Sequence, residues 1–390
     1  MTVCTPKGFR AAGVAAGIKD GGRLDFALVV NDGPGQAAAG MFTTNQVKAA
    51  PVLWSRQVLT DGALRAVVLN SGGANACTGP EGFQTTHATA EKAAEVLGSA
   101  GFPCGAVEVA VCSTGIIGEQ LPRAALLAGV EKAAAELAAG PEAATAAATA
   151  VLTTDNHPKQ AHVAAAGFAV GGFAKGSGMI APAMATMLVV LTTDAVADAA
   201  TCDAALRSAV GATFDRLDID GGTSTNDTVL LLASGASGVT PSDAELTAAV
   251  HAACTDLCLQ LQADAEGVTK HVTIAVTGAR SEADALAVAR TVAQDNLCKT
   301  AFFAGDPNWG RIAMAVGRAP GQVDAQRLGI AINGVPLCRA GVAVGDRHAA
   351  DMSGRDITVA VELGLGDGAA EILTTDLSHA YVEENSAYSS

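Results

Sequence analysis

The sequence predicts an α/β protein, and three observations indicate this class. Of its 390 residues 49% are hydrophobic and only 4% are aromatic, while 44 are glycine, a composition typical of compact α/β proteins rich in Ala and Val. Short apolar or alternating segments are interspersed with longer Ala-rich segments of helical type. No apolar run reaches the ~18 residues of a membrane span, and the N-terminus lacks the order of a signal peptide, so we expect a cytoplasmic protein.

The charge and the cysteines exclude several classes of function. A formal net charge of −15 argues against nucleic acid and anionic membranes as partners, because both attract a positive field. The nine cysteines include no CxxC pair, and the seven histidines form no HxH or HExxH cluster. Cys254 and Cys258, at helical spacing in an apolar segment, are expected to be buried free thiols. The sequence therefore predicts neither a metal site nor a disulfide framework.

Strands and helices are expected in alternation through the first part of the chain. Leu24, Phe26, Leu28 and Val30 alternate with polar or small residues, which predicts a half-buried strand. The patterns that follow predict strands at residues 64–70 and 107–111, and helices at residues 83–97, from about residue 121, and at 131–152.

Two loops between these elements are candidate parts of a site. Residues 70–79 are rich in Gly and Asn, so their N–H groups can line a pocket, or the glycines can simply allow a crossover with unusual dihedral angles. Residues 112–119 form a strand-to-helix turn, in which the hydroxyl of Thr114 and the N–H of Gly115 can stabilise an oxyanion. An N-cap and a tight turn is the more frequent use of such residues.

The second part of the chain repeats the alternation and ends in a smaller α/β unit beyond about residue 278. Expected here are strands at residues 187–191 and 229–232, helices at 201–210 and 244–261, and in the last unit a helix at 281–297, a turn at 306–311 and strands at 329–332, 357–363 and 370–373. The acids of the polar loop at 218–227 do not follow the EF-hand order and are expected to be turn residues. Glu266, beside Gly267, is a surface acid at a helix end or faces a substrate amine.

The bond between Ala185 and Thr186 separates a Gly/Pro-rich loop from an apolar strand. On spacing alone an ordinary entry into a strand is favoured. The chemistry allows more, because the Thr hydroxyl can attack the carbonyl of Ala185 in an N-to-O acyl shift, and hydrolysis of the ester leaves Thr186 as a new N-terminus. Its α-amine, with a pKa of about 7.7–8.0, can then activate its own hydroxyl as a nucleophile.

The segment from Lys175 to Met187 resembles the self-cleavage signature of the ornithine acetyltransferase (glutamate N-acetyltransferase) family of arginine biosynthesis. Seven further blocks resemble the family in its order, at residues 70–79, 113–119, 153–155, 220–228, 264–267, 306–311 and 385–390. Eight blocks are far more specific than one short motif. The chain departs from the family at Gly73, where Asn is usual, and at Gly222, where Asp is usual, which bears on substrate preference and loop order more than on the reaction.

The resemblance implies a role for nine residues. It makes Thr186 the nucleophile, places cleavage between Ala185 and Thr186, and makes Thr114 and Gly115 the oxyanion hole. It implies that the substrate-binding residues are Thr153, Lys175, Thr186, Glu266, Asn385 and Ser390. In charge terms, Glu266 can pair with the side-chain ammonium of ornithine and Lys175 with a substrate carboxylate.

The resemblance also implies the architecture and the reaction. Cleavage gives an α chain of residues 1–185 and a β chain of residues 186–390, in which 186–278 complete an α/β sandwich of sheets between helix layers and 279–390 form the smaller domain. The expected assembly is an α2β2 heterotetramer.

The reaction that the resemblance implies moves the acetyl group of N2-acetyl-L-ornithine to L-glutamate through acetyl-Thr186, with ping-pong kinetics and no cofactor. Acetyl-CoA as a further co-substrate is left open. Two alternatives remain, a self-processed amidohydrolase or aminopeptidase that uses the same Thr, and an unprocessed, non-catalytic paralogue.

Overall fold

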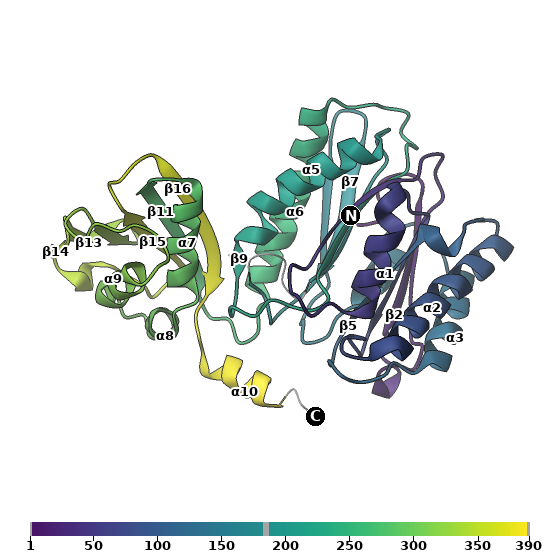
Figure 1. Cartoon of the computed structure of the whole chain (residues 1–390), viewed down its shortest axis with the longest axis horizontal. Coiled ribbons are helices and arrows are strands. Elements are labelled where there is room, and N and C mark those ends of the chain that lie inside the picture. The colour runs from purple at the N-terminus through teal and green to yellow at the C-terminus, as the bar shows by residue number, and fades with distance from the viewer. Residues whose placement is uncertain (1, 182–186, 388–390) are drawn as a thin grey trace. The chain divides into compact units, whose positions relative to one another are not determined.

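The computed structural model describes residues 2–181 and 187–387 (Figure 1). The chain divides into two compact units, each with its own sheets and core. The first comprises Met1–Asp215 with Thr223–Leu261, and the second comprises Arg216–Gly222 with Gln262–Ser390. The expected α/β class is confirmed.

Two sheets make up the first unit. The strands of the four-stranded sheet, in order, are β1 (Phe9–Val14), β2 (Phe26–Asn31), β4 (Ala66–Ser71) and β5 (Val109–Thr114). Those of the five-stranded sheet are β3 (Ala37–Phe42), β10 (Thr228–Ala233), β8 (Leu188–Thr193), β7 (Ala169–Lys175) and β6 (Lys159–Ala164). Only the β4–β5 and β8–β10 pairs are parallel within these sheets, as far as the described strands show.

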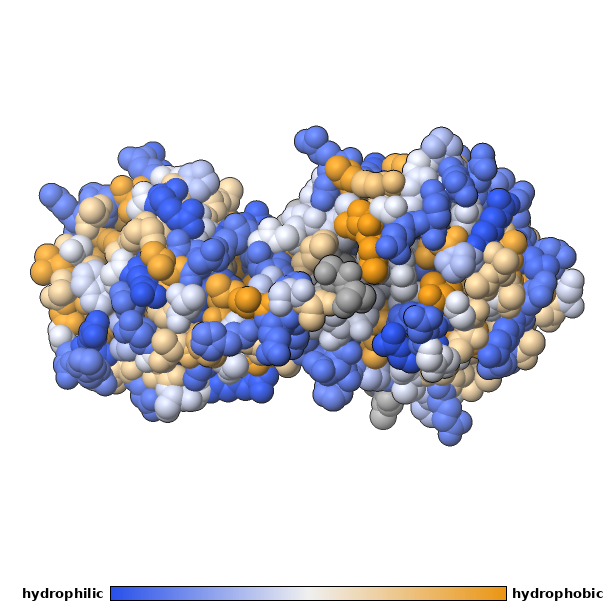
Figure 2. Space-filling model, turned by 90° about the horizontal axis from the view of Figure 1, so that it is seen from below, coloured by the Kyte–Doolittle hydropathy of each residue, from blue (hydrophilic) through white to orange (hydrophobic). Residues whose placement is uncertain are grey.

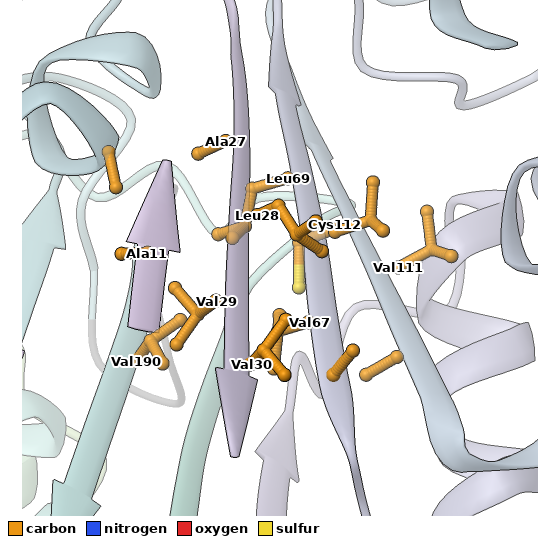
Figure 3. Packing of buried hydrophobic residues seen from close by; sticks show 14 of the residues in the cluster. Ala11, Ala27, Leu28, Val29, Val30, Val67, Leu69, Val111, Cys112 and Val190 are labelled. Atoms are coloured by element: carbon orange, nitrogen blue, oxygen red, sulfur yellow. The ribbon is translucent and has the colours of Figure 1, made fainter. Parts of the chain in front are cut away.

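The two sheets of the first unit pack face to face. Every residue of β2, β4, β5, β8 and β10 is buried, as expected of strands covered on both faces. One hydrophobic cluster joins β2, β4 and β5 to Phe173, Val190 and Leu230 of the other sheet. Figure 3 shows Val190 together with the labelled side chains of β2, β4 and β5.

Helices cover the outer faces of this pair of sheets. The helices of the first unit are α1 (Ala50–Val58), α2 (Gly79–Ser99), α3 (Arg123–Ala135), α4 (Pro141–Ala150), α5 (Ala199–Ala212) and α6 (Asp243–Ala263), the last of which continues past the unit boundary at Leu261. Helices α3 and α4 contact β2, whereas α5 contacts β3 and β10. The layers therefore run helix, sheet, sheet, helix, which is the predicted sandwich.

Helix α1 closes the exposed edge of the four-stranded sheet. The indole Nε1 of Trp54 donates to the carbonyl of Val109 at 2.9 Å. The hydroxyl of Ser55 donates to the carbonyl of Val111 at 2.7 Å and accepts from its N–H at 2.9 Å. These bonds satisfy backbone groups of β5 that have no further strand beside them, so the edge is protected from pairing with another chain.

Two expectations for the first unit were wrong. The strand at Phe26–Asn31 is buried on both faces, not half-buried, because helices α3 and α4 cover the face that lies away from the second sheet. The single helix expected at 131–152 is two helices. Gly140, with φ 111°, breaks the chain after α3, and Pro141, which has no N–H to donate, begins α4.

The second unit is built on a seven-stranded sheet. Its strands, in order, are β14 (Val342–Ala343), β13 (Val335–Arg339), β12 (Gly329–Ile332), β15 (Asp356–Glu362), β11 (His271–Ala279), β16 (Gly368–Thr375) and β9 (Leu217–Asp218). Its helices are α7 (Glu282–Ala293), α8 (Asn296–Ala304), α9 (Trp309–Gly317) and α10 (His379–Ala387). Helix α7 packs on β11 and β16, and α9 packs on β12.

The second unit differs from its prediction in two ways. Its main segment begins at Gln262, not at residue 279, because β11 is an inner strand that pairs with both β15 and β16. The helix expected at 281–297 is broken into α7 and α8, since the carboxylate of Asp295 accepts from the N–H of Cys298 at 3.0 Å and caps a new helix. The strands expected at 329–332, 357–363 and 370–373 are confirmed as β12, β15 and β16.

The surface and the thiols agree with the composition. On the face shown in Figure 2, hydrophilic residues predominate and hydrophobic ones are interspersed among them. Within the described ranges, every helix is too short or too polar to cross a membrane. Cys254 and Cys258 are free and buried, as predicted.

Candidate active site

Lys175, the last residue of β7, is the centre of a buried polar cluster in the first unit. Its side chain is 2% exposed. Its Nζ donates to the hydroxyl of Thr153 at 2.9 Å and to the hydroxyl of Thr114 at 3.3 Å. Thr114 ends β5 and Thr153 follows α4, so three of the predicted site residues come together from three separate elements.

Asp155 neutralises this cluster. Its Oδ1 accepts from Lys159 Nζ at 2.7 Å and from the Gly176 N–H at 2.6 Å, while its Oδ2 accepts from the Thr153 N–H at 3.1 Å and lies 3.8 Å from Lys175 Nζ. Burial acts to raise the pKa of Asp155, but Lys175, Lys159 and the Gly176 N–H together hold it at about 2. The carboxylate is therefore ionised at neutral pH. Sequence reasoning placed Asp155 in a family block without giving it this role.

The turn after β5 requires glycine. Gly115 has φ 132°, and a Cβ added there would meet the backbone N of Gly73 at 2.5 Å. The Gly73 N–H donates to the Thr114 carbonyl at 3.0 Å, so the two loops lie directly against each other. A Cβ at Gly73 would meet the end of the Leu121 side chain, with Cδ2 at 2.6 Å, so a larger residue there requires that side chain to shift.

The hydroxyl of Thr114 has the right partners for an oxyanion donor. Its oxygen accepts a hydrogen bond from Lys175, so its own proton remains available for another acceptor. The neighbouring Gly115 supplies a backbone N–H beside it. Two donors on one turn, next to a buried ammonium group, can stabilise negative charge on a substrate oxygen.

Asn226 links three polar loops that sequence reasoning treated separately. Its Nδ2 donates to the carbonyl of Ala74 at 2.6 Å and to the carbonyl of Ser113 at 2.9 Å. The hydroxyl of Ser113 also donates to Asn70 Oδ1 at 2.6 Å. The Asn-rich loop, the turn after β5 and the loop before β10 are therefore held together around one amide.

Asp227 is a buried carboxyl that the sequence did not single out. Its Oδ1 accepts from the N–H of Met187 at 3.2 Å, and its Oδ2 has no hydrogen bond within the described residues. Burial raises the pKa of Asp227 well above its usual value, although the Met187 N–H and Lys175 act in the opposite direction. The signal for it was an acid at the end of a polar loop, directly before the apolar strand β10.

The remaining predicted residues lie elsewhere. In the second unit, Asn385 Nδ2 donates to Glu266 Oε2 at 2.8 Å, so these two are brought together. Ala185, Thr186 and Ser390 lie outside the described residues. Over the parts of the chain that the structure describes, no three His, Cys, Asp or Glu side chains are grouped to hold a metal ion.

Comparison with known proteins identifies the family. The model of the ArgJ family matches residues 10–390. This chain belongs to the ArgJ family. The arginine biosynthesis bifunctional protein ArgJ of Mycolicibacterium paratuberculosis is 61% identical over 389 residues, which cover 100% of this chain and 96% of that protein. The protein of the same name from Streptomyces coelicolor is 55% identical over 391 residues and is covered completely, as is this chain.

Among solved structures, ornithine acetyltransferase from Mycobacterium tuberculosis, in complex with ornithine, is similar to part of this chain. The match has 56% identity and a TM-score of 0.44, and it covers 48% of this chain and 96% of that one. Membership of the ArgJ family confirms the family that the eight sequence blocks indicated.

Proposed function

We propose that this ArgJ-family chain is an acetyltransferase of arginine biosynthesis, which moves the acetyl group of N2-acetyl-L-ornithine to L-glutamate. The observation that carries the proposal is the contact of Lys175 with Thr114 and Thr153 in a family member that matches its relatives over its whole length. This contact supplies a buried positive charge at a turn with two oxyanion donors.

The first step that we propose is self-cleavage. The hydroxyl oxygen of Thr186 attacks the carbonyl carbon of Ala185, the C–N bond breaks, and the amide nitrogen leaves as an amine that carries the hydroxyl proton. Water then hydrolyses the ester and frees residue 186 as an N-terminal Thr. The hydrogen bond between Asp227 and the Met187 N–H supports this step, because it fixes the peptide that follows the nucleophile.

Acetyl transfer would use the same hydroxyl. The α-amine of Thr186 takes the hydroxyl proton, and the oxygen attacks the acetyl carbonyl of acetylornithine. Thr114 and Gly115 donate to the oxyanion that forms, and Lys175 stabilises its charge through Thr114. Collapse of the intermediate releases ornithine, whose amine accepts the proton. The α-amine of glutamate then attacks acetyl-Thr186 by the same route.

Several finer points remain proposals on the strength of the family resemblance. We propose that the substrate is contacted by Thr153, Lys175, Glu266, Asn385 and Ser390. We also propose an α2β2 heterotetramer, a cytoplasmic location and a reaction that needs no cofactor. The relatives are called bifunctional, and acetylation of glutamate from acetyl-CoA through acetyl-Thr186 is the second activity that we propose to test.

Replacing Thr186 tests the scheme directly. Thr186→Ala is expected to abolish both cleavage and transfer, because one hydroxyl serves both, whereas Thr186→Ser should retain part of each. A denaturing gel and N-terminal sequencing measure cleavage, and the wild-type β chain should begin Thr-Met-Leu-Val-Val. Maturation of the Ala variant to two chains would refute the assignment of the nucleophile.

An assay with acetylornithine separates transfer from hydrolysis. Release of ornithine by the wild type should depend on glutamate, with acetylglutamate formed in equal amount. Release without glutamate would show that water resolves the acyl-enzyme, as in an amidohydrolase. A single full-length band without activity would instead identify a non-catalytic paralogue.

A further inference from the structure

The ammonium group of Lys175 makes several contacts within the protein. A lysine ammonium has three N–H groups. Around Lys175 Nζ lie the Thr153 hydroxyl at 2.9 Å, the Thr114 hydroxyl at 3.3 Å and Asp155 Oδ2 at 3.8 Å. Since the side chain is also almost wholly enclosed, a substrate carboxylate at this cluster would be bound more tightly with a second cation beside it.

Lys19 is a second cation at the same cluster, and the backbone holds it in place. The carboxylate of Asp25 is fully buried. It accepts from the N–H groups of Ala16 at 2.6 Å, Ile18 at 2.7 Å and Lys19 at 2.9 Å. These three bonds fix the loop after β1, so the position from which the Lys19 side chain extends is set before any substrate binds.

The side chain of Lys19 runs between two segments of the candidate site. Its Nζ donates to the carbonyl of Leu152, the residue before Thr153, at 2.5 Å. The aliphatic part of the Lys19 side chain lies against Gly72, since a Cβ added to Gly72 would be 3.2 Å from Lys19 Cγ. The carbonyl carbon of Gly72 would in turn be 2.7 Å from a Cβ added to Gly115. Lys19 therefore lies next to the oxyanion turn and the Thr153 segment at once.

Lys19 has binding capacity that the protein itself does not use. Its side chain is partly exposed, and two of its three N–H groups make no hydrogen bond within the described residues. Burial lowers the pKa of Lys19 to about 8, with Arg23 and Lys175 adding to the effect and Asp25 and Asp155 opposing it. The positive charge is thus incompletely balanced, and an anion beside it would be stabilised.

We propose that Lys19 binds the α-carboxylate that acetylornithine and glutamate have in common. In both substrates this carboxylate is one carbon away from the nitrogen that is released or attacks, while the acetyl oxygen is held at Thr114 and Gly115. The group that binds the carboxylate must therefore lie close to that turn, as Lys19 does. The inference rests on the proposed function and adds a binding residue to it.

The test compares two substrates in three proteins. Wild type, Lys19→Gln and Lys19→Arg are assayed for ornithine release from N2-acetylornithine and from its α-carboxamide, with glutamate as acceptor. In Lys19→Gln, kcat/KM for the acid should fall about 10- to 100-fold, the range for hydrogen bonds to a charged group, and kcat/KM for the amide should change little. Lys19→Arg should restore part of the preference for the acid. Cleavage to two chains and an unchanged thermal midpoint show that each variant is folded and mature.

Each other outcome has a definite meaning. An equal fall for acid and amide in Lys19→Gln would show that Lys19 only supports the loop structure, and an unchanged acid rate would show that another group binds the carboxylate. Both results overturn the inference and leave the acetyltransferase in place. If the wild type releases no ornithine from acetylornithine, the proposed function itself fails, and this result is seen before any variant is compared.

Discussion

Asp227 is a buried carboxyl that accepts a hydrogen bond from the backbone. Burial raises the pKa of this carboxyl well above its usual value and so favours its neutral form, and its Oδ1 accepts the hydrogen bond of the Met187 N–H. Asp227→Asn should therefore retain stability, because an amide of the same shape keeps the acceptor. Asp227→Ala should cost about 1–3 kcal/mol, since the N–H is left without a partner in the core.

Thermal unfolding of the two Asp227 variants checks this prediction. Both are made in the Thr186→Ala background, so that every sample is a single chain and cleavage does not affect the midpoint. Equal destabilisation by Asn and Ala would mean that the carboxyl is ionised and paired, contrary to the burial that raises its pKa.

At the level of single residues, the sequence predicted which side chains gather but not how their bonds are shared. Thr114, Thr153 and Lys175 were expected at one site, and the structure places them in contact. Asp155 and Lys19 were missed as functional residues, because their roles depend on which donors are already occupied. Such an account requires distances between segments far apart in the chain, and local patterns contain none.

At the level of elements, Asp155 forms ion pairs with the first residue of β6 and the last residue of β7. Lys159 begins β6, and Lys175 ends β7, and both ammonium groups are buried against the same carboxylate. Asp155→Asn should destabilise the protein by about 3–5 kcal/mol, because it leaves two buried cations without a counterion. The exposed Asp61→Asn is the control and should leave the thermal midpoint unchanged.

The pH dependence of the Asp155 effect follows from the direction of its pKa shift. The pKa of this carboxyl in the folded protein, about 2, is lower than the unfolded value of about 3.9, so its contribution is complete above the unfolded pKa and is lost as pH falls through the folded one. The difference in midpoint between wild type and Asp155→Asn should therefore shrink from pH 4 towards pH 2. A difference that grows on acidification would contradict the ion pairing.

Strand β11 illustrates what local patterns contain at this level. Val272, Ile274 and Val276 alternate with exposed or partly exposed residues, so the sequence pattern is sufficient to predict a strand here. The pattern does not predict that this strand lies between β15 and β16, which is why the main segment of the second unit begins at Gln262. Pairing of strands separated by about a hundred residues leaves no local signal. The breaks at Pro141 and Asp295, in contrast, were visible as residues that end or begin helices.

At the level of the whole molecule, the first unit is assembled from both sides of the proposed cleavage bond. Strand β7 from before it pairs with β8 from after it, with Phe173 opposite Val190, and β3 pairs with β10. The hydrophobic cluster of the two facing sheets also takes residues from both parts. In the second unit, β9 pairs with β16 in parallel, with Leu217 opposite Leu373. Sequence reasoning treated the β9 segment as loop, because only the fold brings these two residues together.

The sheet pairing predicts that the two cleaved chains remain associated. Separation would break the β7–β8 and β3–β10 ladders and expose the core between the sheets, so residues 1–185 and 186–390 should stay together without a covalent bond. With an affinity tag at the C-terminus, the untagged 1–185 chain should be retained in buffer and released only in denaturant. Thr186→Ala, which carries the same tag, should give one band under both conditions. Elution of the 1–185 chain in buffer would show that the five-stranded sheet does not hold the cleaved protein together.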